Sequence, residues 1–236
     1  METQLAAPKR SAYDLVVVGG GIVGLSCAWR VAQSGGRVLC VERDVPGAGA
    51  SGVAAGMLAP VTEADFGEDA GLRLLIAGRE RWPAFAAELE ERSGMPTGFR
   101  ECGALVVATD RDDVEELRRL HELQRSLGLA AEWLAPSDCR RAEGWLSPRV
   151  AGGILATGDA QADPRATVRA LAAGCTEVAT GVEVHAVDND GSRVTGVRTS
   201  RGSIECEQVV VAAGAWSAGL APAAACLLYT SPSPRD

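Results

Sequence analysis

Three glycines and one acid near the start of the chain have the spacing of a dinucleotide-binding site. Gly19, Gly21 and Gly24 form a G-x-G-x-x-G pattern, and Glu42 follows the first of them by 23 positions. In this pattern the first glycine permits a tight strand-to-helix turn, the second lets the backbone approach a pyrophosphate, and the third lets helix and strand pack closely. An acid at about this distance accepts the ribose hydroxyls. It would also repel a ribose 2′-phosphate, so FAD or NAD is favoured over NADP.

The glycine pattern is a strong indication of a dinucleotide site because the strands and the helix needed to position it flank it in the sequence. Residues 15–18 are an apolar run typical of a buried strand, residues 22–34 have a helical pattern ended by two glycines, and residues 38–41 form a second apolar strand. The N-terminus of such a helix offers free N–H groups and the positive end of its dipole to phosphates. We therefore expect a dinucleotide site here; the alternative is a structural βαβ unit that binds nothing.

Composition narrows the function classes. A formal net charge of −8 without a basic cluster argues against a nucleic-acid partner. The sequence contains no apolar run near the roughly 18 residues of a membrane span. Seven cysteines without a C-x-x-C pair predict buried, reduced thiols and a cytoplasmic protein. The two histidines, His121 and His185, have no partners at ligand spacing, so zinc and a Ser-His-Asp triad have little support.

The rest of the chain alternates between helical and strand patterns. Pro83 should kink or break the first of the later helices, and residues 188–191 have the composition of a tight turn. The expected elements are helices at 68–92, 110–127 and 164–174, a short helix within 133–148, strands at 99–109, 154–158, 177–187 and 208–213, and a hairpin over 194–206.

A stretch of small residues follows Glu42, from Gly47 to Leu58. One interpretation is a flexible linker. Val53, Met57 and Leu58 within it, and its position directly after a βαβ unit, favour a loop that wraps the cofactor.

This loop, GASGVAAGML after a G-x-G-x-x-G unit, resembles the glycine oxidases of thiamine biosynthesis, within the D-amino-acid-oxidase-like flavoenzymes. The resemblance extends over residues 13–220. Three further stretches carry it. The family's entry into the substrate domain is similar to CGALVVATDRDDVEELRRL, and its return to the cofactor domain is similar to GGILATGDAQADPRATVRAL. The family's strand beneath the flavin is similar to VVVAAGAWS.

The resemblance implies an α/β fold with a Rossmann-like FAD-binding domain and an inserted α+β substrate domain, both incomplete. The expected FAD-binding domain comprises residues 13–92 and 152–225, and residues 93–151 begin the substrate domain. Residues 1–12 are expected to be a disordered tail. Residues 226–236, with a Ser/Pro alternation not found upstream, resemble a translated sequencing adapter; a natural Pro/Ser-rich tail is the alternative. On the first interpretation about a third of the protein, including the arginine that binds the substrate carboxylate, would lie beyond this chain.

The resemblance also implies a reaction. Non-covalent FAD would take the α-hydrogen of glycine, sarcosine or a small D-amino acid as hydride, giving an oxo acid, ammonia and hydrogen peroxide with O₂ as acceptor. No general base is required, and no catalytic residue is assigned. The product would serve thiazole synthesis, and the full-length protein could be a homo-oligomer without nucleic-acid or membrane partners. The alternatives are an FAD dehydrogenase with another acceptor and an inactive truncated fragment.

The expected cofactor contacts, besides the three glycines, lie at the phosphate turn, the ribose, the loop, the isoalloxazine and the adenine. Ile22 and Val23 are expected at the phosphate turn, Glu42 and Arg43 at the ribose, and Ala50 and Ser51 in the loop. Ala55, Gly56 and Met57 are expected beside the isoalloxazine, and the backbone of Val182 at the adenine. Gly214, after the last apolar strand, should permit close backbone approach to the cofactor. The family often has hydroxyl residues at the positions of Ala50 and Ser51, so alanine at position 50 removes one donor.

Overall fold

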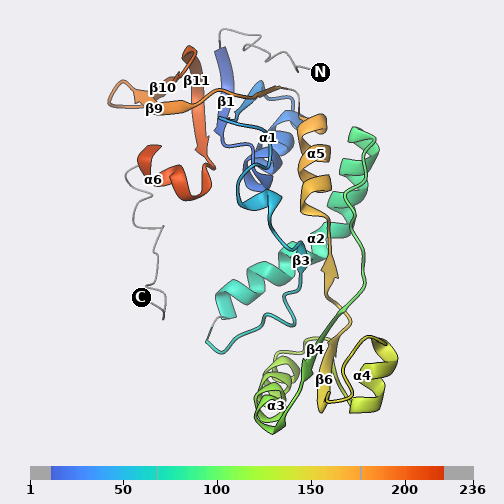
Figure 1. The fold of residues 1–236 in the computed structure, drawn as a ribbon. Coiled ribbons are helices and arrows are strands. Elements are labelled where there is room, and N and C mark those ends of the chain that lie inside the picture. The colour runs from blue at the N-terminus through green and yellow to red at the C-terminus, as the bar shows by residue number, and fades with distance from the viewer. Residues whose placement is uncertain (1–11, 68, 176, 221–236) are drawn as a thin grey trace. The chain divides into compact units, whose positions relative to one another are not determined.

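The computed structural model (Figure 1) describes residues 12–67, 69–175 and 177–220. The tail expected at residues 226–236 lies outside them. So does the tail expected at residues 1–12, except for Ala12, which begins the first strand. The chain forms two compact units. The first takes its described residues from 1–54, 89–96 and 164–236, and the second from 55–88 and 97–163.

The first unit contains a six-stranded sheet of order β8-β2-β1-β11-β10-β9. Its strands are β1 (Ala12–Val18), β2 (Val38–Val41), β8 (Val178–Ala179), β9 (Val184–Asn189), β10 (Val194–Thr199) and β11 (Gly202–Val211). The four strands β8, β2, β1 and β11 are parallel, and β10 and β9 continue the sheet antiparallel. Every residue of β2 is buried, as expected for a parallel strand covered on both faces.

Parallel pairing places the ends of three strands at one edge. Val18 at the end of β1 pairs with Val41 of β2 and with Val211 of β11. The residues that follow them, Gly19, Glu42 and Ala212, therefore share the carboxyl edge of the sheet. Open α/β sheets bind ligands at this edge.

Two helices of the first unit, α1 (Ile22–Gln33) and α5 (Pro164–Gly174), pack against each other (Figure 1). Each runs antiparallel to the parallel strands, because α1 leads from the end of β1 to the start of β2 and α5 leads to the start of β8. Both helices therefore begin near the carboxyl edge.

One strand prediction in this unit is wrong, and a second is confirmed with other bounds. The single strand expected at 177–187 is two strands at opposite ends of the sheet, since β8 pairs with β2 and β9 pairs with β10. Gly181, with a φ of 64°, turns the chain between them. The predicted hairpin is confirmed, but its second strand continues without interruption to Val211, so the strand expected at 208–213 is the end of β11.

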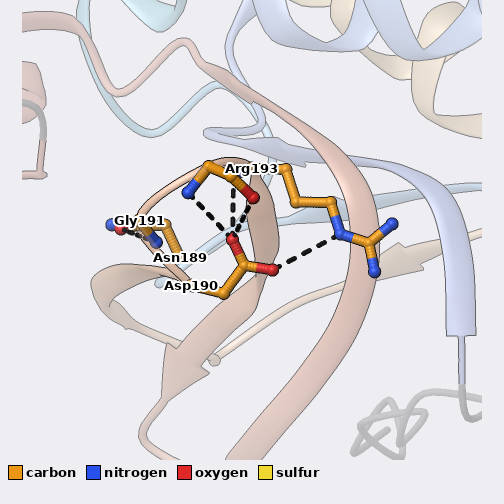
Figure 2. Close-up of polar contacts among 5 residues, drawn as sticks. Asn189, Asp190, Gly191 and Arg193 are labelled. Carbon is orange, nitrogen blue, oxygen red and sulfur yellow. Dashed lines mark hydrogen bonds and ion pairs between the residues drawn. The ribbon is translucent and has the colours of Figure 1, made fainter.

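The turn between β9 and β10 is organised by Asp190 (Figure 2). Its Oδ1 accepts hydrogen bonds from the Ser192 hydroxyl (2.7 Å), the Ser192 N–H (2.9 Å) and the Arg193 N–H (3.0 Å). The Arg193 Nε lies 3.5 Å from the other oxygen. These donors, the Ser192 hydroxyl first, stabilise the carboxylate and lower the pKa of Asp190 to about 2.

We expect Asp190 to titrate near pH 2 in a carbon-detected NMR titration of its carboxyl group, well below the ordinary value of 3.8. Because the folded-state pKa is lowered, the turn's contribution to stability is present above about pH 4 and is lost as the pH falls towards 2. Replacing Ser192 by alanine should move the midpoint back towards the ordinary value, since its hydroxyl is the main cause of the shift. A midpoint near 3.8 in the unmodified protein would show that the turn does not form.

The second unit has two small sheets. β6 (Gly152–Ala156) lies between β4 (Ala104–Ala108) and β5 (Ala131–Leu134), all antiparallel, and β3 (Met57–Leu58) pairs with β7 (Ala160–Gln161). The helices are α2 (Asp69–Ser93), whose residues from Leu89 belong to the first unit, α3 (Arg111–Ser126) and α4 (Pro136–Ala142).

The domain boundary expected at residue 152 differs from the observed division. Because β6 is the central strand of a sheet with β4 and β5, residues 152–163 belong to the second unit, as do residues 55–88. The short helix expected within 133–148 is confirmed as α4, and Trp133 before it belongs to β5, where it pairs with Ile154. The strand expected at 99–109 is confined to β4, preceded by Gly103 with a φ of 69°.

Of the two outcomes expected at Pro83, a kink or a break, the break does not occur, and the kink stays a prediction. The helix continues through it to Ser93. Trp82 stacks on Phe99 at 6.1 Å between ring centroids and contacts Phe85 edge to face at 5.1 Å. Aromatic packing on both sides of the proline offsets the hydrogen bond that its missing N–H removes.

The cysteine prediction holds only in part. The described cysteines are free, and Cys40, Cys139 and Cys206 are buried, but Cys102 is exposed. Burial raises the pKa of Cys175 to about 11. Cys226 lies outside the described residues.

Candidate functional site

The glycine turn after β1 is closely packed at two of its three glycines. Gly19 has a φ of 111°, and a Cβ there would lie 2.4 Å from the Ala212 carbonyl oxygen. A Cβ at Gly24 would lie 2.0 Å from the Gly19 carbonyl oxygen. At Gly21 the nearest atom to an added Cβ is the Ser51 hydroxyl, at 3.2 Å, with no backbone near it. The first and third glycines therefore close the turn, and the second leaves one side open.

The start of α1 presents unsatisfied donors at this open side. The first helical bond joins the Leu25 N–H to the Gly21 carbonyl at 3.0 Å, so the Val23 and Gly24 N–H groups precede any helical acceptor. Val23 is 65% exposed, and the first turn contains no acidic residue. These N–H groups and the helix dipole form an anion site suited to a phosphate.

The small-residue loop is docked on this turn. The Gly47 N–H donates to the Gly20 carbonyl at 2.9 Å, and the Ile22 N–H donates to the Ser51 hydroxyl at 3.0 Å. Ala50–Gly52 form a short 3₁₀ helix. The flexible-linker interpretation is therefore wrong, because the loop is fixed to the residues expected to hold the pyrophosphate.

Replacing Ser51 by alanine is expected to lower the free energy of unfolding by about 1 kcal/mol, because the Ile22 N–H loses its acceptor at the start of α1. FAD affinity should fall as well, since the loop loses one of its two bonds to the turn. Urea unfolding and FAD titration measure the two effects. Ser34→Ala is the control: its hydroxyl bonds to Val31 at the other end of α1, so it should leave FAD affinity unchanged.

Glu42 is fixed against the same turn. Its Oε2 accepts from the Gly20 N–H at 2.6 Å and its Oε1 from the Asp44 N–H at 2.9 Å. Each oxygen keeps a further lone pair that a ribose hydroxyl could use. The Val182 N–H donates to the Glu42 carbonyl at 3.0 Å, so any backbone contact from Val182 to an adenine must use its carbonyl oxygen.

Arg43 has a partner that the sequence did not reveal. Its guanidinium lies 3.9 Å from the centroid of the Trp216 ring, and Trp216 ends the 3₁₀ helix Gly214–Trp216 just after β11. The two residues are far apart in the chain and meet only because β2 and β11 flank β1. Gly214 itself has a φ of 55° and open space where a Cβ would lie.

The residues expected beside the isoalloxazine, Ala55, Gly56 and Met57, belong to the second unit. Gly56 has a φ of 83°, and its carbonyl accepts from the Ala162 N–H at 2.9 Å. Met57 pairs with Gln161 and is 57% exposed. Their contact with a flavin stays a prediction.

The first unit meets the requirements of a dinucleotide that carries a diphosphate and a ribose. It combines a glycine turn open at Gly21, free N–H donors at a helix N-terminus, and a carboxylate fixed at the neighbouring strand end. Among the described residues, no group of His, Cys, Asp and Glu could hold a metal ion. In the same part of the chain, no helix is long and apolar enough to span a membrane.

Comparison with known proteins identifies a family with the same kind of cofactor site. Residues 14–233 match the DAO family, described as FAD-dependent oxidoreductases. The glycine oxidase of Geobacillus kaustophilus is 32% identical over 214 residues, which are 88% of this chain and 56% of that protein. Its crystal structure matches with a TM-score of 0.83 at 31% identity, covering 90% of this chain and 58% of the other.

Two other relatives show the range of the family. The bifunctional protein ThiO/ThiG of Trichormus variabilis is 32% identical, over 89% of this chain and 32% of that protein. The mitochondrial sarcosine dehydrogenase of Homo sapiens is 30% identical, over 90% of this chain and 24% of that protein. This chain thus spans about half the length of the glycine oxidase it matches, and less of the other two. It belongs to the DAO family of FAD-dependent oxidoreductases.

Proposed function

We propose that this protein oxidises a small amino acid, glycine first, with FAD as cofactor and O₂ as electron acceptor. The observation that carries the proposal is the docked loop 47–52 on the glycine turn: Ser51 and Gly47 both bond to it, in a chain 32% identical to a glycine oxidase. Sarcosine and small D-amino acids are further candidate substrates.

The proposed reaction converts glycine, O₂ and water to glyoxylate, ammonia and hydrogen peroxide. FAD, when bound, supplies the two-electron chemistry that removes the α-hydrogen and passes the electrons to oxygen. The described residues position the cofactor: the Val23 and Gly24 N–H groups would hold a phosphate, Glu42 a ribose, and Ser51 fixes the loop. We assign no substrate-binding side chain within residues 12–220.

The resemblance to the bifunctional ThiO/ThiG protein supports a role in supplying the thiazole part of thiamine. We also propose a cytoplasmic location and a homo-oligomer for the whole protein. Both are consistent with free cysteines in the described residues and with the general tendency of soluble enzymes to form symmetric assemblies.

The test is an oxygen-electrode assay with glycine on the full-length protein. Peroxide formed in step with oxygen uptake supports the oxidase. The second candidate is an FAD dehydrogenase with a non-oxygen acceptor, favoured by the 30% identity to a sarcosine dehydrogenase. Reduction of an artificial dye without formation of peroxide would support the dehydrogenase and contradict the oxidase proposal.

For the 236-residue chain by itself we propose FAD binding without turnover, because none of its arginines lies at a position that matches the family's substrate arginine. Flavin titration and the same oxygen assay on the purified chain test this. Measurable turnover would contradict it. Reading the gene beyond codon 225 would show whether an arginine of that kind follows.

A further inference from the structure

Arg165 at the start of α5 contacts the docked loop one residue after Ser51, which binds the start of α1. Its Nε donates to the Gly52 carbonyl at 2.7 Å, across 113 positions of sequence. This single bond leaves the two terminal amino groups of the guanidinium for other acceptors. The side chain is exposed, and the sequence pattern did not mark it.

Arg165 lies in the first turn of α5, and the loop links this turn to the start of α1. Because α1 and α5 pack together and both begin near the carboxyl edge, their N-termini lie on the same side of the first unit. The loop joins them: Ser51 binds the first N–H of α1, and Gly52 binds Arg165. Gly47 packs on Val168 of α5, where an added Cβ would come within 3.0 Å of Cγ1.

Arg165 is also a cation without a counter-charge. Among residues 12–67, 69–175 and 177–220, no carboxylate lies within ion-pair distance of it. Three other arginines of the first unit are paired, Arg37 with Asp14, Arg193 with Asp190 and Arg198 with Asp188. Arg165 differs from the exposed Arg169 and Arg201 in being fixed by a hydrogen bond to the loop. A guanidinium fixed to Gly52, the residue after the Ser51 that binds the start of α1, favours an anionic ligand.

We propose that Arg165 is a further cofactor-binding residue: it holds the loop through Gly52 and donates from its free amino groups to the diphosphate of FAD. The inference rests on the proposed cofactor site and adds a residue to it. Arg165 would supply the donor that alanine at position 50 lacks, since a charged fork replaces a missing hydroxyl at the same loop.

The test is FAD titration of the 236-residue chain, followed by flavin fluorescence, at low and high salt. Arg165→Ala and Arg165→Gln should each weaken FAD affinity about tenfold or more at low salt, the range expected for one charge-assisted hydrogen bond. The loss should shrink at high salt because the contact is exposed and screened. Arg165→Lys should recover part of the affinity. Arg169→Ala, which removes an exposed arginine one turn further along α5, is the matched control and should bind as the unmodified chain does.

Glutamine can still donate to the Gly52 carbonyl, so it separates the two roles. If Arg165→Gln binds FAD as well as the unmodified chain, or if the loss is the same at all salt concentrations, Arg165 only braces the loop and the diphosphate contact is overturned. An equal loss in Arg169→Ala would also overturn it, by showing a general charge effect. If the unmodified chain binds no FAD, the cofactor assignment falls together with this inference. Circular dichroism of each variant confirms that it is folded.

Discussion

Replacing Gly24 by alanine is expected to abolish FAD binding and to lower the free energy of unfolding by about 2 kcal/mol. The added Cβ would lie 2.0 Å from the Gly19 carbonyl oxygen and 3.2 Å from the Ala212 side chain. Contact at 2.0 Å with a backbone atom cannot be relieved by a side-chain rotation, so the helix or the turn must move.

Two effects oppose each other in this variant. Alanine is favoured over glycine in a helix by about 1 kcal/mol, whereas forced overpacking costs typically 1–3 kcal/mol and occasionally more. The clash should dominate because its partner is the carbonyl of Gly19, which has a φ of 111° and is itself confined by Ala212. Any shift of Gly19 displaces the open side of the turn at Gly21.

Urea unfolding and flavin titration measure the two consequences separately. Gly78→Ala is the matched control, because Gly78 lies in α2 with open space where its Cβ would be; it should be neutral or slightly stabilising and leave FAD affinity unchanged. A Gly24→Ala protein that binds FAD normally would show that helix and turn are not in close contact.

The first three elements of the first unit could be predicted because each depends on a local pattern. The β1–α1–β2 unit follows from an apolar run, three glycines and a helical period, and all three elements are confirmed with small changes of bounds. The loop's position after this unit was also predictable. The bonds that hold it were not, because Ser51 and Gly47 reach back to residues 20–22 through space.

The errors arise where tertiary pairing overrides local preference. Residues 177–187 read as one apolar strand, but their halves pair at opposite ends of the sheet. Arg165 and Trp216 escaped prediction for a related reason. Both lie in stretches that resemble the family, but each joins the site only through a partner, Gly52 or Arg43, more than a hundred positions away.

The other large effect is expected at Asp159, a fully buried acid in the second unit. Its carboxylate accepts from the Val61 N–H (3.0 Å), the Thr62 N–H (3.0 Å) and the Thr62 hydroxyl (2.9 Å). Replacing Asp159 by alanine should lower the free energy of unfolding by about 3 kcal/mol or more, because hydrogen bonds to charged groups contribute about 1.5–3 kcal/mol each and their buried donors would be left unsatisfied.

Two milder variants separate the contributions of the individual hydrogen bonds of Asp159 to stability. Thr62→Val removes the hydroxyl, with its bond to Asp159 and a longer contact of 3.4 Å to the Ala59 carbonyl, and should cost about 1 kcal/mol. Asp159→Asn keeps one acceptor oxygen and turns an NH₂ group towards the other donors, so its cost should fall between the two. The Asp159→Ala, Thr62→Val double variant should cost less than the sum of the single changes, since both remove the same bond.

Asp159, just before β7, binds the N–H groups of the segment after β3, and helix α3 binds a carbonyl of the same segment. The buried Gln124 of α3 donates to the Val61 carbonyl at 2.8 Å, so both faces of this residue's backbone are tied to distant parts of the unit. Loss of Asp159 should therefore raise hydrogen exchange at Val61 and Thr62 while leaving the β4–β6–β5 sheet protected. Unchanged exchange at these two amides, with unfolding within 0.5 kcal/mol of the unmodified protein, would show that the buried acid does not hold the segment.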